Sequence, residues 1–119
     1  MKSIYNFGNI VWVNLPKSDN HLQHGIRKAL IVSNNKNNEN SPNLHIIPLT
    51  TKSKRFVLHL HRNNARDFYC IEQLMLIPKE YVMLDRSYEY FDDSQLKDIY
   101  NLIDVQIGRK TISDIRRSV

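Results

Sequence analysis

Several ingredients are scarce in this chain of 119 residues, and each scarcity excludes a class of protein. Cys70 is the only cysteine, so neither an intramolecular disulfide nor a zinc site built from several cysteines can form. No stretch approaches the roughly 20 apolar residues that a membrane-spanning helix needs, and the N-terminus carries no apolar signal segment. These absences predict a cytoplasmic protein that contacts no membrane.

Acidic residues are also in the minority. The chain has 12 Asp and Glu against 17 Lys and Arg, which gives a formal net charge of +5. A basic surface favours polyanionic partners such as RNA, DNA or an acidic protein segment, without choosing among them. With 41% hydrophobic and 24% charged residues the composition is globular, and the length predicts one domain over residues 1–119.

Short β-rich runs fill the first two thirds of the chain and predict five strands. They cover residues 10–13, 28–33, 44–50, 56–61 and 68–74. The run at 28–33 is apolar at its centre, which indicates burial on both faces. Proline has no amide hydrogen, so Pro48 predicts an edge or a bulge in the third strand. The polar segments 16–25 and 34–42 are expected to form a long loop and a turn region.

The strand predicted over 56–61 alternates with a period of two. Residues 56, 58 and 60 face one way, and Val57, His59 and His61 face the other. Two histidines on one face are too few for a metal site, and the sequence shows no third ligand. We therefore expect both histidines to be exposed to solvent or RNA, and we predict no metal and no cofactor. Cys70 is expected to be a small buried residue rather than a nucleophile.

A helix is predicted near the end of the chain. Asp92 resembles an N-terminal cap, with Gln95 three residues later as its capping-box partner. Apolar residues then share one helical face: Leu96, Ile99, Tyr100, Ile103 and Ile107. Gly108 is placed to end the helix in a left-handed cap, and the basic tail 109–119 is expected to form a second short helix or to fray. Strands followed by one helix predict a mainly β protein, a small barrel with a packed C-terminal helix.

Three segments, in this order, resemble a known family. They read GNIVWV from Gly8, GIRKALIVSN from Gly25, and PLTTKSK from Pro48, the last led by Ser41-Pro42. Together they resemble the MazF/PemK (Kid-like) family, the toxin ribonucleases of type II toxin–antitoxin modules. The resemblance extends from residue 7 to about residue 107, and the order and spacing of the motifs carry it.

The resemblance implies an SH3-like barrel of the CcdB/Kid/PemK type with a C-terminal amphipathic helix, working as a homodimer. It implies sequence-specific cleavage of single-stranded mRNA without a metal. It also implies neutralisation by a cognate antitoxin with an acidic, disordered segment, and contact with DNA only through that antitoxin.

The family's catalytic residues map onto positions of this sequence. Its arginine matches Arg27, its threonine or serine matches Thr50, and the acidic residue before a glutamine matches Glu72. Some members carry a histidine six residues before the arginine, where His21 stands. Residues expected to hold RNA beside them are Gln23, Lys28, Thr51, Lys52, Ser53, Lys54 and Gln73.

The chemistry of RNA cleavage suits these residue types. The 2′-hydroxyl can attack its own phosphate, and negative charge then gathers on the phosphoryl oxygens. A fixed guanidinium such as Arg27 stabilises that charge more in the transition state than in the ground state, and the Thr50 hydroxyl can donate a further hydrogen bond. Either His21 or Glu72 can serve as the base that takes the 2′-proton.

The chain departs from the family pattern at four positions. Asn9 stands for an aspartate, Leu22 for a glutamate and Lys28 for a proline, while Met75 replaces an arginine that would contact phosphate. Two other functions stay open. A CcdB-like gyrase poison shares the fold but depends on a Trp-Gly-Ile ending, where this chain has residues 116–119, RRSV. A non-catalytic RNA-binding barrel would fit the changes at Leu22 and Met75.

Overall fold

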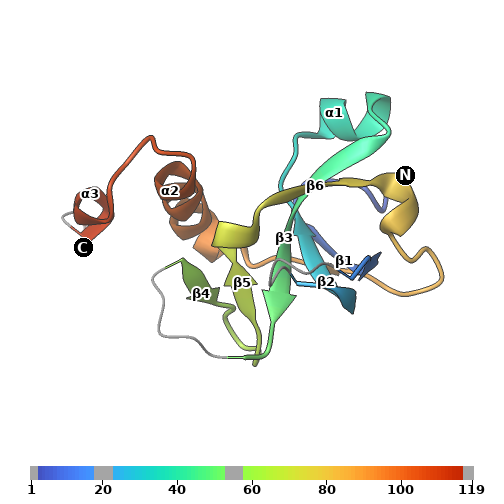
Figure 1. The fold of residues 1–119 in the computed structure, drawn as a ribbon, viewed down its shortest axis with the longest axis horizontal. Helices are drawn as coiled ribbons and strands as arrows, with labels where there is room; N and C mark the ends of the chain where they lie inside the picture. The colour runs from blue at the N-terminus through green and yellow to red at the C-terminus, as the bar shows by residue number, and fades with distance from the viewer. Residues whose placement is uncertain (1–2, 18–22, 53–57, 117–119) are drawn as a thin grey trace.

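The structure, a computed structural model, describes residues 3–17, 23–52 and 58–116 (Figure 1). Its strands form an antiparallel sheet in the order β4-β5-β3-β2-β1-β7, with β6 also paired to β3. The strands are β1 Asn9–Leu15, β2 Gly25–Ile31, β3 Asn43–Thr50, β4 His59–His61, β5 Phe68–Cys70, β6 Met75–Pro78 and β7 Glu89–Tyr90. The helices are α1 Asn35–Asn40, α2 Leu96–Gln106 and α3 Ile112–Arg116. The strands predicted over 10–13, 28–33 and 44–50 overlap β1, β2 and β3, while β6 and β7 were not anticipated.

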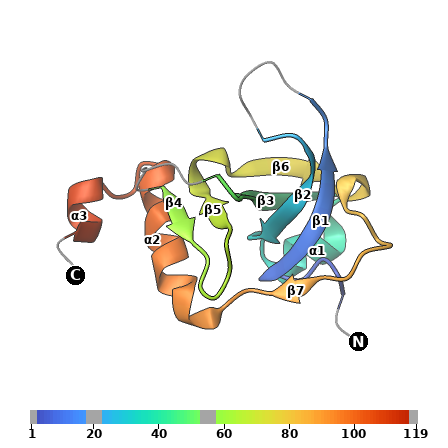
Figure 2. The same ribbon diagram turned by 90° about the horizontal axis from the view of Figure 1, so that it is seen from below.

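The sheet closes on itself to form a small barrel. β1 pairs with β2, β2 with β3, and β3 with β6. The chain after β6 returns to β1, because Val82 bridges Val13 and the Met83 amide donates to the Trp12 carbonyl at 2.8 Å (Figure 2). The barrel interior is filled by buried aliphatic side chains: Val11, Val13, Leu15, Ala29, Ile31, Leu44, Ile46, Ile77 and Val82. The small barrel expected from the sequence is confirmed.

A second core lies on the opposite face of the same strands, under α2 (Figure 1). Alternate residues of β1, β2 and β3 pack there against the β4–β5 hairpin and the helix: Ile10, Leu30, Ile47, Leu49, Leu58, Tyr69, Ile71, Phe91, Ile99 and Leu102. Leu30 therefore faces one core while its neighbours Ala29 and Ile31 face the other, which confirms that this strand is buried on both faces. Burial of an aliphatic side chain such as Leu102 contributes about 1.5–3 kcal/mol to stability.

Pro48 lies where the strand beside β3 is interrupted. Residues Ile46 and Leu49 pair with Met75 and Tyr69, so β3 advances three residues while the neighbouring chain advances six. The extra residues form a 3-10 turn, η1 Ile71–Gln73. Since Pro48 has no amide hydrogen to offer there, the pairing loses little when the neighbour turns aside. The predicted bulge is confirmed, and the strand expected over 68–74 is corrected to β5 and η1, with Leu74 leading into β6.

The segment 34–42 is a short helix rather than a plain turn region. The Asn34 side chain caps α1 by accepting a hydrogen bond from the Asn37 amide at 2.8 Å. Asn38 is buried, and its side-chain amide donates to the Ser33 carbonyl at 2.9 Å. Asparagine side chains that satisfy backbone groups therefore hold a helix whose composition alone indicates a turn.

The helix α2 ends as predicted, but Asp92 caps a preceding 3-10 turn, η3 Asp93–Gln95, and α2 itself begins at Leu96. Asp92 accepts from the Ser94 amide at 3.0 Å, and Gly108 adopts φ +83, as a left-handed cap requires. Gln95 does not complete a capping box: it is buried, donates to the His61 carbonyl and accepts from the Asn63 amide. The buried positions are Ile99 and Leu102, whereas Tyr100 is exposed. Ile107 is exposed as well.

The basic tail was expected to form a second short helix or to fray, and the structure shows the helix, α3. Among the described helices, none is both long and apolar enough to cross a membrane. The strand predicted over 56–61 is described only from Leu58 onward, as a turn residue followed by β4, so residues 56 and 57 lie outside the described part of the chain.

Gly8 offers a test of the packing at the start of β1. Its φ is +87, and a Cβ there would lie 2.7 Å from the Phe91 ring. Gly8→Ala should cost about 3 kcal/mol of unfolding free energy, because left-handed strain and overpacking each contribute about 1–2 kcal/mol. Gly108→Ala is the matched control, since its φ is +83 but nothing lies within 4 Å of the added carbon. Urea unfolding should show the larger loss for Gly8→Ala; equal losses would contradict this packing.

Candidate functional site

Arg27 projects from the start of β2 and is held by the surrounding backbone. Its Nε donates to the His24 carbonyl at 3.0 Å, and one terminal nitrogen donates to the Leu49 carbonyl at 3.2 Å. The same nitrogen donates to the Gln23 side-chain oxygen. The other terminal nitrogen makes no hydrogen bond with the described residues. The guanidinium is therefore fixed in orientation while keeping donors for a bound anion.

Partial burial also shapes the charge at this position. Desolvation lowers the pKa of Arg27 from its usual value, and interaction with nearby Cys70 opposes that shift. An arginine remains protonated at every physiological pH despite such a shift. Arg27 thus provides a permanent positive charge, part-shielded from water, where electrostatic interactions are stronger than on an open surface.

Thr50 ends β3 beside Arg27. Continuing the β2–β3 ladder two residues beyond the Ala29–Pro48 pair places Arg27 opposite Thr50. The Thr50 hydroxyl is almost buried and accepts from the Lys52 amide at 3.2 Å, which leaves its own hydrogen to donate. Thr51 and Lys52 follow in an exposed turn. The structure therefore brings a hydroxyl donor and a basic turn to the side of the guanidinium.

The turn η1 brings Glu72 and Gln73 to the same end of the barrel. The Gln73 side-chain oxygen accepts from the Gln23 amide at 2.6 Å, and Gln23 in turn contacts Arg27. Glu72 is hydrogen-bonded through Oε1 to His59 Nε2 at 2.6 Å. A chain of contacts therefore runs from Gln73 on η1 through Gln23 to the guanidinium, while the neighbouring Glu72 is held by His59.

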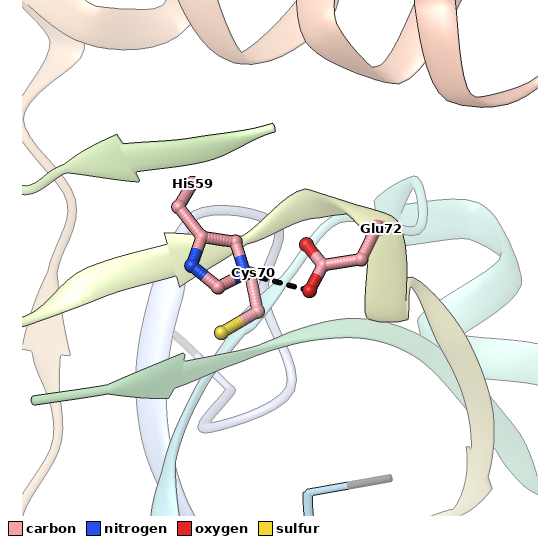
Figure 3. A group of neighbouring side chains, drawn as sticks. All are labelled: His59, Cys70 and Glu72. Carbon is pink, nitrogen blue, oxygen red and sulfur yellow. Dashed lines mark hydrogen bonds and ion pairs between the residues drawn. The ribbon is translucent and has the colours of Figure 1, made fainter. Parts of the chain in front are cut away.

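The expectation that His59 is exposed was wrong. Its side chain is only 2% exposed, and it lies against Glu72 and the buried Cys70 (Figure 3). The β4–β5 ladder pairs His59 with Cys70 directly, a register that the sequence does not specify. His61, two residues on, is exposed as expected and contacts the Ala65 carbonyl at 2.8 Å. Burial of Cys70 is confirmed.

Not every residue expected at the site reaches it. Lys28 pairs with Glu89 at 3.2 Å and lies over the Trp12 ring, so the structure does not bring it to Arg27. Met75 is half-buried against the barrel core. His21, Leu22, Ser53 and Lys54 lie outside the described residues. Hydrogen bonds join Arg27 to Gln23 and Gln23 to Gln73, and Thr50 ends the neighbouring strand, whereas Glu72 contacts His59.

This arrangement provides the groups that phosphoryl chemistry on RNA needs. A fixed guanidinium and a hydroxyl donor can stabilise negative charge on a phosphate, and a carboxylate can accept a proton. The side-chain amides of Gln23 and Gln73 offer donors and acceptors for polar groups of a nucleotide. An exposed lysine at position 52 adds positive charge at the rim.

Comparison with known proteins gives a family match over most of the chain. A family model described as the PemK-like, MazF-like toxin of type II toxin–antitoxin systems matches residues 6–105. Among individual proteins, the sequence is similar to Endoribonuclease MazF of Staphylococcus saprophyticus, with 23% identity over 111 residues. That alignment covers 88% of this chain and 92% of the relative.

Solved structures share the fold. MazF (Form-I) from Deinococcus radiodurans superposes with a TM-score of 0.73 at 17% identity, covering 87% of this chain and 96% of that one. The MazE–MazF complex (Form-II) from the same organism gives 0.71 at 16%, covering 92% and 100%. An endoribonuclease in complex with its cognate antitoxin from Mycobacterial species gives 0.71 at 15%, covering 88% and 96%. At these identities the superpositions establish the barrel and its helix.

Proposed function

The chain belongs to the family of PemK-like, MazF-like toxins of type II toxin–antitoxin systems, and from this premise we propose that it is a sequence-specific endoribonuclease that cleaves single-stranded mRNA without a metal. The observation that carries the proposal is the fixed guanidinium of Arg27, held by the His24 and Leu49 carbonyls next to the end of β3, where Thr50 lies. A relative named as an endoribonuclease supports the same activity. Because the proposed substrate is mRNA, we propose that the protein acts in the cytoplasm.

The proposed reaction uses the RNA's own 2′-hydroxyl. Its oxygen forms a bond to phosphorus while the bond from phosphorus to the 5′-oxygen breaks, which leaves a 2′,3′-cyclic phosphate and a 5′-hydroxyl. Arg27 stabilises the charge on the phosphoryl oxygens, and the Thr50 hydroxyl donates to one of them. Glu72 takes the 2′-proton; His21, the other candidate base, lies outside the described residues. Gln23, Gln73, Thr51 and Lys52 contact the flanking nucleotides.

We also propose that the chain works as a homodimer. Large apolar side chains stay exposed on one chain: Ile26, Leu76, Leu84, Tyr88, Tyr90, Tyr100, Ile107 and Ile112. These side chains are candidates for burial between two copies of the chain, and membership of the toxin family supports pairing. Sedimentation at micromolar concentration should give twice the 14.1 kDa mass of one chain. A single 14.1 kDa species would contradict pairing.

The proposed inhibitor is a cognate antitoxin, as found with two structural relatives. The net charge of +5 favours an acidic, disordered segment that becomes ordered over Arg27 and Lys52. Contact with DNA would then occur only through the antitoxin. Because charge pairs at this surface are screened by ions, we expect salt to weaken the complex.

One gel separates this function from the alternatives. The purified chain is incubated with a long RNA, and separately with supercoiled DNA and gyrase. Cutting of the RNA at a few sites, stopped by the cognate antitoxin, is the expected result. Trapped gyrase–DNA complexes would identify a gyrase poison instead, and RNA that is retarded but uncut would identify a binding protein without activity.

A further inference from the structure

His59, Cys70 and Glu72 form a compact group of metal-ligating side chains, here called the donor cluster. One atom from each residue, an imidazole nitrogen, the thiol sulfur and a carboxylate oxygen, lies within 4.8 Å of the other two (Figure 3). The residues come from three elements, β4, β5 and η1. They converge because β4 pairs His59 with Cys70, and η1 then turns Glu72 toward the ring.

The donor cluster is set into the protein rather than spread over its surface. The His59 side chain is 2% exposed, Cys70 is fully buried, and the Glu72 side chain is 25% exposed. Glu72 Oε2 is itself buried and accepts no hydrogen bond from any described group. A buried carboxylate oxygen without a partner is costly, and a bound cation would remove that cost.

We propose that the donor cluster is a binding site for a divalent cation of the zinc class. Thiolate and imidazole ligands favour Zn²⁺, whereas Mg²⁺ and Ca²⁺ take sets of oxygen ligands. Zinc binds nitrogen and oxygen at about 2.0–2.2 Å and sulfur at about 2.3 Å, so ligand atoms around a tetrahedral ion stand roughly 3.3–3.6 Å apart. The donor atoms already lie within 4.8 Å of one another. Three protein ligands leave a fourth position for water.

Metal binding exchanges protons for the ion. The ion takes the place of the proton shared between His59 and Glu72, whose atoms must move apart from 2.6 Å by somewhat less than ~1 Å. Cys70 binds as a thiolate and releases its proton to solvent.

The effect on RNA cleavage rests on the proposed function. A carboxylate bound to Zn²⁺ cannot accept the 2′-proton, so an occupied donor cluster withdraws Glu72 from catalysis. The same turn carries Gln73, which holds the Gln23 amide beside Arg27. The cation is therefore an inhibitor of the ribonuclease, and cleavage itself needs no metal.

Binding is tested on the full metal-free chain with Zn²⁺ in competition with a chromogenic chelator, and with Co²⁺ as a spectroscopic probe. We expect one ion per chain and a sulfur-to-cobalt charge-transfer band. Cys70→Ser and His59→Ala should each weaken Zn²⁺ binding by about 100-fold or more, since loss of an outer partner alone costs about 10- to 100-fold. His61→Ala is the matched control, a histidine on the same strand that lies outside the cluster, and it should bind as the wild type does.

The outcomes separate the site from the proposed function. Absence of stoichiometric binding, a cobalt spectrum without the sulfur band, or equal affinity in Cys70→Ser would overturn the metal site. Cleavage is compared with and without Zn²⁺ for each variant, and inhibition should be lost in Cys70→Ser. Cysteine-dependent binding that leaves cleavage unchanged would keep the site and remove Glu72 from the reaction. A chain that never cuts RNA would refute the proposed function, while the cobalt spectrum still decides the site.

Discussion

Arg27→Ala should lower the rate of RNA cleavage by about 100-fold or more, equivalent to roughly 3 kcal/mol of transition-state stabilisation. The guanidinium is fixed by the His24 and Leu49 carbonyls before any substrate binds, so little reorganisation accompanies the reaction. Arg27→Lys should recover little of the loss, because one ammonium cannot both keep those backbone contacts and present two parallel donors to a phosphate. Single-turnover cleavage of one labelled RNA measures the effect.

The control for this substitution is Arg86→Ala, which removes an exposed arginine that lies over Trp12, away from the Arg27 site. Its cleavage rate should stay within about twofold of the wild type, as expected for a surface change outside the site. Unfolding curves of Arg27→Ala establish that the variant is folded when assayed. A folded Arg27→Ala that cuts RNA at near wild-type rate would remove Arg27 from the mechanism.

The second large effect comes from the substrate. A single 2′-deoxynucleotide immediately before the cut should abolish cleavage while RNA binding changes little, because only the attacking oxygen has been removed. The same deoxynucleotide placed one position after the cut is the control and should be cleaved normally. A chelator should leave the rate on unmodified RNA intact or raise it, since the proposed reaction needs no metal.

Product ends give an independent check of the same mechanism. The upstream fragment should carry a 2′,3′-cyclic phosphate or its opened form, and the downstream fragment a 5′-hydroxyl. Mass spectrometry of the fragments distinguishes these from the ends left by attack of water. Dependence on magnesium, or cleavage at the deoxynucleotide, would point to a hydrolytic mechanism in which Arg27 and Glu72 have other roles.

The sequence predicted the barrel well because local patterns dictate it. The apolar run through Leu30 required burial on both faces, and Gly108 required the end of a helix; both hold in the structure. Motif spacing likewise singled out Arg27 and Thr50, and the structure puts Arg27 in contact with the Leu49 carbonyl, one residue before Thr50. Hydrophobic periodicity and motif spacing therefore predict the structure correctly where it depends on contacts within one strand or between adjacent strands.

Sequence patterns failed where long-range contacts decide. His59 alternates as an exposed residue does, and only the pairing of β4 with β5 reveals that Cys70 and Glu72 cover it. The segment before β3 reads as a turn, yet the Asn34 cap and buried Asn38 make it helical. Gln95 was assigned to a local cap, but its amide bonds the backbone around His61 and Asn63. His59 and Gln95 thus depend on distant partners, whereas α1 depends on nearby asparagine side chains whose contacts the composition does not specify.

The absence of an amide hydrogen at Pro48 has a consequence for how the RNA specificity of this enzyme can change in evolution. The ladder beside β3 tolerates an excursion there, and that excursion carries Glu72 and Gln73. The barrel pairings on either side stay in register whatever those two side chains are. If the proposed function holds, substitutions at Gln73 can therefore change contacts with RNA while the strand pairings that hold the barrel stay as they are.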